Sequence, residues 1–157
     1  LGQLDFCIIT CRESRCRWIP LQEDELVILL PSAHPAAKEA VLPLSFLERE
    51  PYIEIFPGQE TDNSRLLQKS GIQTQTRYTT SSDEAAFAMV QAGLGATLIN
   101  SLQLPQTDDS LAVLSLKPPH CVEIGIALPP AEEISPAAKR FAAFVLKRLR
   151  EETGAEP

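Results

Sequence analysis

Short apolar runs alternate with amphipathic stretches along these 157 residues. Strands fully covered by helices read as near-continuous apolar runs, and helices place apolar residues about 3.6 positions apart. The alternation predicts an α/β fold with mostly parallel strands. We expect strands at residues 4–10, 18–21, 25–30, 52–56, 76–80, 95–99, 111–116 and 122–128.

Helix boundaries carry local signals. Ser45 with Glu48 and Ser81 with Glu84 have the spacing of a capping box, in which a serine and a later glutamate satisfy main-chain N–H groups. The first predicts a short helix over residues 46–49, and the second a helix that ends at Gly93. A further helix is expected to start at Thr61 or Asp62 and to stop at Gly71. The last helix is expected to start at Ser135, which precedes Pro136.

Composition and charge narrow the classes of protein. The chain is 44% hydrophobic and 22% charged, as in ordinary globular domains, and its net charge is -7. Its longest apolar run, residues 26–31, is far too short to span a bilayer, and no secretory signal is visible. One basic cluster lies at residues 139–150, where it complements the C-terminal end of a helix dipole. These residues alone are not expected to bind DNA.

The four cysteines, Cys7, Cys11, Cys16 and Cys121, lack the paired spacing of a structural zinc site. Cys7 falls in an expected buried strand, where a thiol behaves as a small apolar group. The favoured interpretation is a reduced protein with inert thiols. A redox sensor that uses Cys11 and Cys16 stays open as an alternative.

Catalytic signatures are missing from the sequence. The two histidines, His34 and His120, each adjoin a proline in an expected loop, and neither has the context of a catalytic triad. The acidic pairs are adjacent, so on a helix their carboxylates point in different directions. The Gly93–Gly95 segment closes a helix and opens a strand, the reverse of a phosphate-binding loop. We therefore expect no enzyme, no metal and no cofactor.

Small polar groups follow the carboxyl ends of several expected strands, where α/β sheets bind ligands. Helices are expected to start nearby, at residues 61–64 and 81–84. Main-chain N–H groups at a helix start favour a carboxylate or another small anion. The sequence thus predicts a module that binds a small molecule.

Five segments, in order, resemble the effector-binding domain of LysR-type transcriptional regulators. They are LGQLD with Ile8–Ile9, the stretch from Pro20 to Pro35, residues 44–53, AFAMVQAGLGATLI at residues 86–99, and SPAA at residues 135–138 with Phe141. The resemblance covers nearly the whole chain. It implies two Rossmann-like lobes of the periplasmic-binding-protein type.

On this resemblance, residues 1–51 and 119–157 form a partial first lobe, and residues 52–118 form the second. The first βαβ unit of lobe one, a linker helix and a winged helix-turn-helix would lie outside the chain. Asn100 departs from the family, which usually has proline there. The effector-binding residues expected from the resemblance and the strand ends are Thr10, Phe56, Pro57, Gly58, Thr61, Ser64, Ser81 and Asn100.

The function implied is the sensing of a small, anionic metabolite held between two lobes, which controls DNA binding by the absent N-terminal domain. The whole protein is expected to be a cytoplasmic homodimer or homotetramer without membrane contact. The alternative is a solute-binding protein of a transport system, which shares the fold.

Overall fold

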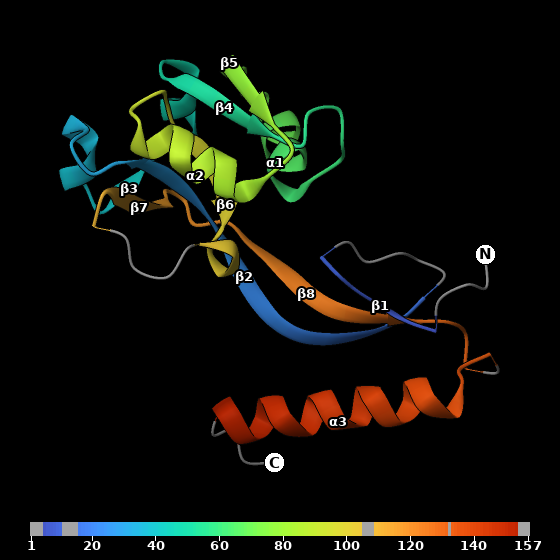
Figure 1. Ribbon diagram of the computed structural model, residues 1–157. Coiled ribbons are helices and arrows are strands. Elements are labelled where there is room, and N and C mark those ends of the chain that lie inside the picture. Colours follow the sequence, from blue (N-terminus) through green and yellow to red (C-terminus); the bar gives the residue numbers. More distant parts are fainter. Residues whose placement is uncertain (1–4, 11–15, 105–108, 132, 154–157) are drawn as a thin grey trace. The chain divides into compact units, whose positions relative to one another are not determined.

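The computed structural model describes residues 5–10, 16–104, 109–131 and 133–153 (Figure 1). The chain divides into two compact units: unit 1 comprises Leu1–Glu23 and Val122–Pro157, and unit 2 comprises Asp24–Cys121. These bounds differ from the expected lobes in residues 24–51 and 119–121, which pack within unit 2. The difference arises because strand β2 (Arg17–Pro31) is one continuous strand, and its second half pairs with strands of unit 2.

Unit 1 combines the first part of β2 with β1 (Cys7–Ile9), β8 (Cys121–Leu128) and helix α3 (Pro136–Thr153) (Figure 1). Strand β1 pairs antiparallel with β8. The Ser135 hydroxyl accepts a hydrogen bond from the Ala138 N–H at 3.1 Å, so α3 starts where the sequence predicts. Its apolar side packs on β8. The buried core of unit 1 consists of Ile126, Leu128, Ile134, Ala138 and Ala142.

In unit 2, the second half of β2 lies between β6 (Thr97–Asn100) and β7 (Leu111–Leu116), antiparallel to both. Strand β3 (Val41–Leu42) adds to β7 in parallel. Short 3₁₀ helices follow β2, β3 and β6: η1 (Pro35–Lys38), η2 (Leu44–Glu48) and η3 (Ser101–Gln103), respectively.

A two-stranded parallel sheet, β4 (Pro51–Ile55) and β5 (Gln75–Thr80), completes unit 2 together with helices α1 (Asp62–Ser70) and α2 (Asp83–Gln91) (Figure 1). Strand β4 also bridges to Ala96, next to Gly95. A Cβ at Gly95 would lie 2.3 Å from the Pro51 carbonyl oxygen, so only glycine fits this approach. The core of unit 2 is formed by Val27, Leu29, Ile53, Ile55, Ala86, Phe87, Val90 and Ile99.

Three expectations about the fold were wrong. The strands are not mostly parallel, because β1 pairs antiparallel with β8, and β6 and β7 both pair antiparallel with β2. The expected capping box at Ser45 does not form, since η2 follows Pro43 and has no side-chain cap. The residue that caps α2 is Ser82, one position after the serine expected.

Candidate functional site

The loop between β4 and α1 has an unusual backbone. Phe56 is the one non-glycine residue with positive φ in the described part of the chain, at 54°, and Gly58 follows at 75°. A Cβ atom on Gly58 would meet no other atom within 4 Å, so lack of space does not require glycine there. Glycine is favoured because the backbone is left-handed at this position. The Phe56 N–H donates to the Thr80 carbonyl oxygen at 2.7 Å, and the Gln59 N–H donates to the Phe56 carbonyl oxygen at 3.1 Å. These bonds fix the loop against the end of β5.

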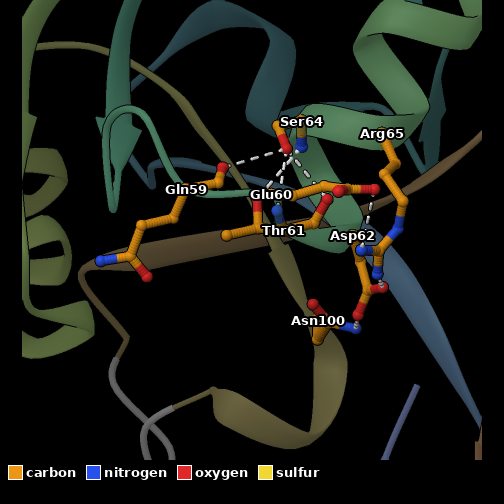
Figure 2. Close-up of polar contacts among 7 residues, drawn as sticks. All are labelled: Gln59, Glu60, Thr61, Asp62, Ser64, Arg65 and Asn100. Atoms are coloured by element: carbon orange, nitrogen blue, oxygen red, sulfur yellow. Dashed lines mark hydrogen bonds and ion pairs between the residues drawn. The ribbon is translucent and has the colours of Figure 1, made fainter. Parts of the chain in front are cut away.

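Helix α1 starts with a reciprocal capping box (Figure 2). The Ser64 N–H donates to the Thr61 hydroxyl at 3.2 Å, and the Thr61 N–H donates to the Ser64 hydroxyl at 2.9 Å. The Ser64 hydroxyl also lies 3.0 Å from the Thr61 carbonyl oxygen and 3.4 Å from that of Gln59. Both hydroxyls therefore stabilise the loop and the helix start before any ligand arrives.

A small charge network lies beside this helix start (Figure 2). Arg65 pairs with Asp62 one turn earlier, and its second nitrogen lies 3.7 Å from Glu60. The Asn100 amide, at the end of β6, donates to the other Asp62 oxygen at 3.4 Å. The Asp62 side chain is 11% exposed, whereas that of Glu60 is 76% exposed. The guanidinium therefore has one sheltered partner and one solvated partner.

A pocket of about 90 Å³ opens between α1, β4 and β5. It is smaller than ligand pockets of roughly 300 Å³ or more, so it can admit part of a ligand at most. Asn63 lines it and donates from its amide to the Leu98 carbonyl oxygen at 2.6 Å. The other amide atom of Asn63, Oδ1, is buried and has no hydrogen-bond partner in the described part of the chain. The pocket is lined by Tyr52, Glu54, Ile55, Phe56, Gln59, Thr61, Asn63, Ser64, Leu67, Thr74 and Thr76.

Tyr52 forms part of the pocket wall with a side chain that is 3% exposed. Burial raises the pKa of its phenol well above the ordinary value of 10, although hydrogen bonds with the Leu98 main chain and the Thr97 side chain oppose the shift. The Asn63 bond to the Leu98 carbonyl oxygen ties α1 to β6 beside this pocket.

The start of α2 is negatively charged. The Ser82 hydroxyl accepts from the Ala85 N–H at 3.3 Å and lies 2.6 Å from the Glu84 carboxylate, whose pKa it lowers. Partial burial and the charge of Glu84 raise the pKa of Asp83. Carboxylates at a helix start already complement its dipole. This helix start is therefore less suited to an anion than the sequence suggested.

The structure brings together six of the eight residues expected to bind an effector. Five of them, Phe56, Pro57, Gly58, Thr61 and Ser64, form one loop and helix start, and Asn100 joins them through Asp62. Ser81 is exposed and follows the end of β5. Thr10 lies in unit 1, directly after β1, and is half-buried. The sequence interpretation missed Arg65, although its i, i+3 spacing from Asp62 is a recognisable signal for an ion pair.

The remaining features raised by the sequence are metal-binding clusters, the cysteines and membrane-spanning helices. Within the described ranges, no cluster of three or more histidine, cysteine or acidic side chains could hold a metal ion. Cys7 and Cys16 are half-buried and Cys121 is exposed, while Cys11 lies outside the described residues. None of the described helices is long and apolar enough to cross a membrane.

Comparison with protein families gives one match that spans residues 1–150, to the LysR substrate binding domain. The chain belongs to this family. A relative in Bacillus subtilis (strain 168), an uncharacterized HTH-type transcriptional regulator named YybE, is 28% identical over 156 residues. The match covers 96% of this chain and 53% of YybE, so the chain spans about half the length of this relative.

Solved structures with the same fold include regulatory and effector-binding domains. The regulatory domain of Synechocystis PCC6803 CcmR, in complex with 2-PG, superposes with a TM-score of 0.81 at 18% identity, and the match covers 95% of this chain and 75% of that one. The effector binding domain of QuiR, in complex with shikimate, gives 0.73 at 23% identity, with coverage of 95% and 73%. The C-terminal domain of a probable LysR family regulator from Rhodococcus sp. RHA1 gives 0.76 at 25% identity, with coverage of 92% and 75%.

These matches confirm the α/β class and the family inferred from the motifs. They identify the chain as an effector-binding domain of the LysR type and favour this assignment over a solute-binding protein of a transport system.

Proposed function

We propose that this LysR domain senses a small metabolite for a transcriptional regulator, whose DNA-binding domain is a winged helix-turn-helix outside the chain. The proposal rests on the family, on the HTH-type relative of about twice this length, and on structural relatives in complex with 2-PG and shikimate. The two compact units are proposed to be the two effector-binding lobes. Binding would then change the relative populations of lobe arrangements.

The observation that carries the proposal is the loop from Phe56 to Ser64. It combines a strained backbone at Phe56, a left-handed glycine and a capped helix start. Sparsely populated backbone conformations concentrate at ligand-binding sites, where surrounding contacts hold them. We propose that Phe56, Pro57 and Gly58 contact the effector, and that Thr61 and Ser64 act mainly by holding the loop. Contacts from Thr10, Ser81 and Asn100 stay predictions.

The charge network supports a carboxylated effector. Arg65 keeps Asp62 as a sheltered partner, but its pair with the solvated Glu60 is of the exposed kind worth about 0–1 kcal/mol. A carboxylate of the effector can replace Glu60 at this small cost and form a charge-assisted hydrogen bond with the guanidinium. We propose Arg65 as the anchor for the effector's negative charge.

The test is a thermal-shift panel of small metabolites, half carboxylated and half uncharged. At a concentration 100 times the dissociation constant, a ligand adds about 2.7 kcal/mol and raises Tm by about 5–10 °C for a domain of this size. Glu60→Gln should enlarge the shift given by the active carboxylate, because it removes the competing charge. Glu39→Gln, an exposed glutamate outside the network, is the matched control.

Two outcomes would contradict parts of this proposal. No shift from any compound, together with no response of the regulated promoter, would reject effector sensing. A shift caused only by uncharged compounds, or one that Glu60→Gln leaves unchanged, would reject the role of Arg65.

We further propose that the regulator acts in the cytoplasm, without an enzymatic activity, as a homodimer or homotetramer.

A further inference from the structure

Helix α3 buries one side and leaves a large aromatic residue on the other. Ala138 and Ala142 are buried in the core of unit 1, and Val145 packs against the same cluster. Phe144 is 60% exposed, the most exposed large hydrophobic side chain among the described residues. Figure 1 shows α3 lying along the strands of unit 1 with its other side uncovered. Phe144 lies in the middle of this 18-residue helix, among exposed charged side chains.

Phe144 belongs to a regular stripe. Arg140, Phe144, Lys147 and Glu151 are all exposed, and their spacing of four, three and four residues places them on one side of the helix. Residues at this spacing can face a second helix, but three of the four are charged, so the contact would be mainly polar and not the apolar seam of a coiled coil. Within one chain, Lys147 lies 3.8 Å from Glu151, so this end of the stripe carries both charges. Arg140 has no carboxylate partner among the ion pairs of the described residues.

The stripe is complementary to itself when two copies run antiparallel. If Arg140 faces Glu151 of a second copy, Phe144 faces Lys147 of that copy. Two-fold symmetry then forms each contact twice: two ion pairs at the ends and two cation–π contacts in the centre. Other alignments are less favourable. Placing the two Phe144 rings opposite each other sets Arg140 against Arg148, and a parallel pair sets every charge against its own copy.

We propose that α3 is a self-association surface, which pairs antiparallel with α3 of a second copy in the register set by Arg140 and Glu151. The net charge of -7 makes two copies repel each other in general, and the cations of α3 lower that repulsion at this face. A single helix pair buries less than the roughly 1,600 Å² of a standard interface, so the contact is weak by itself and salt-sensitive. This inference does not depend on the effector.

Sedimentation velocity over a protein concentration series, at an ionic strength of about 50 mM, measures the association. Arg140→Glu and Glu151→Arg each place like charges at both ends of the pair, so each should weaken association about tenfold. The double variant R140E/E151R exchanges the charges and should restore it. An equimolar mixture of the two single variants should form a heterodimer, because every end pair is then of opposite sign. Lys139→Glu, the same charge change at an exposed position beside the stripe, should have little effect.

Phe144→Ala tests the centre of the contact and should weaken association at least tenfold, as for a central aromatic residue of an interface. Far-ultraviolet circular dichroism checks that each variant keeps α3 folded. A wild-type chain that remains monomeric at high concentration would overturn the proposal, as would a double variant as weak as the single ones. Protection of Phe144 from solvent in a monomeric longer form of the protein would also overturn it, and would assign the face to another segment of the same polypeptide.

Discussion

Replacing Tyr52 by phenylalanine should destabilise the protein at neutral pH and stabilise it above about pH 11. Below pH 10 the phenol is protonated in both the folded and the unfolded chain. The variant then loses the hydrogen bonds at Leu98 and Thr97, which is worth about 1 kcal/mol.

Above pH 10 the sign of the difference changes. Burial raises the folded-state pKa of Tyr52, so the unfolded chain loses its phenol proton first and binds fewer protons than the folded chain. Stability that depends on this proton is complete below pH 10 and falls as the pH rises, by up to about 1.4 kcal/mol per pH unit. Phenylalanine carries no such proton. The gap of about 1 kcal/mol at neutral pH should therefore close near pH 11 and then reverse.

Urea unfolding followed by circular dichroism, in steps from pH 7 to pH 11.5, measures the difference between variant and wild type. Tyr78→Phe is the matched control for removing a phenol, because Tyr78 is 41% exposed on the neighbouring strand β5. A gap between Tyr52→Phe and wild type that stays constant from pH 7 to pH 11.5 would refute the reasoning. It would mean that the phenol ionises equally in both states.

Three further substitutions test local contacts by their effect on urea unfolding. Thr61→Ala removes the cap of α1 and should cost about 1 kcal/mol; an unchanged midpoint would show that the cap contributes nothing. Gly125→Ala places a Cβ 2.3 Å from the Trp18 indole and should cost about 1–3 kcal/mol, with a change in tryptophan fluorescence that Gly71→Ala should not cause. Asp24→Ala leaves the Ser101 hydroxyl and a main-chain N–H without their buried acceptor and should cost about 1–3 kcal/mol.

Local signals in the sequence predicted several elements well. Helix α1 begins after Thr61 and ends at Gly71 as expected, and Ser135 caps α3. Each of these signals is completed by main-chain groups within a few residues, so it can be interpreted without knowledge of the fold. The choice between Ser81 and Ser82 was different. Both can cap a helix, and the end of β5, which is set by pairing with β4, decides which one does.

Strand direction was beyond the sequence, because it depends on distant partners. An apolar strand such as the second half of β2 looks the same whether its neighbours run parallel or antiparallel. The candidate site follows the same division. The loop at Phe56–Gly58 was expected from the family resemblance and from its place after a strand, whereas the contact between Asp62 and Asn100 joins residues 38 positions apart. No local pattern indicates such a contact.

Polar contacts in unit 2 connect the candidate effector loop to the beginning of this unit on β2. Asp62, at the start of α1, bonds Asn100 at the end of β6, and the next residue, Ser101, donates to Asp24 at 2.8 Å. Asp24 is 4% exposed and is the first residue of unit 2. An effector carboxylate that replaces Glu60 would shift the Arg65 guanidinium while Asp62 stays its partner, so the bond between Asp62 and Asn100 would shift with it. A shift of η3 would then reach β2 where this strand enters the unit. An effector at the loop could thus change the position of β2 through these contacts, without a large rearrangement of the core.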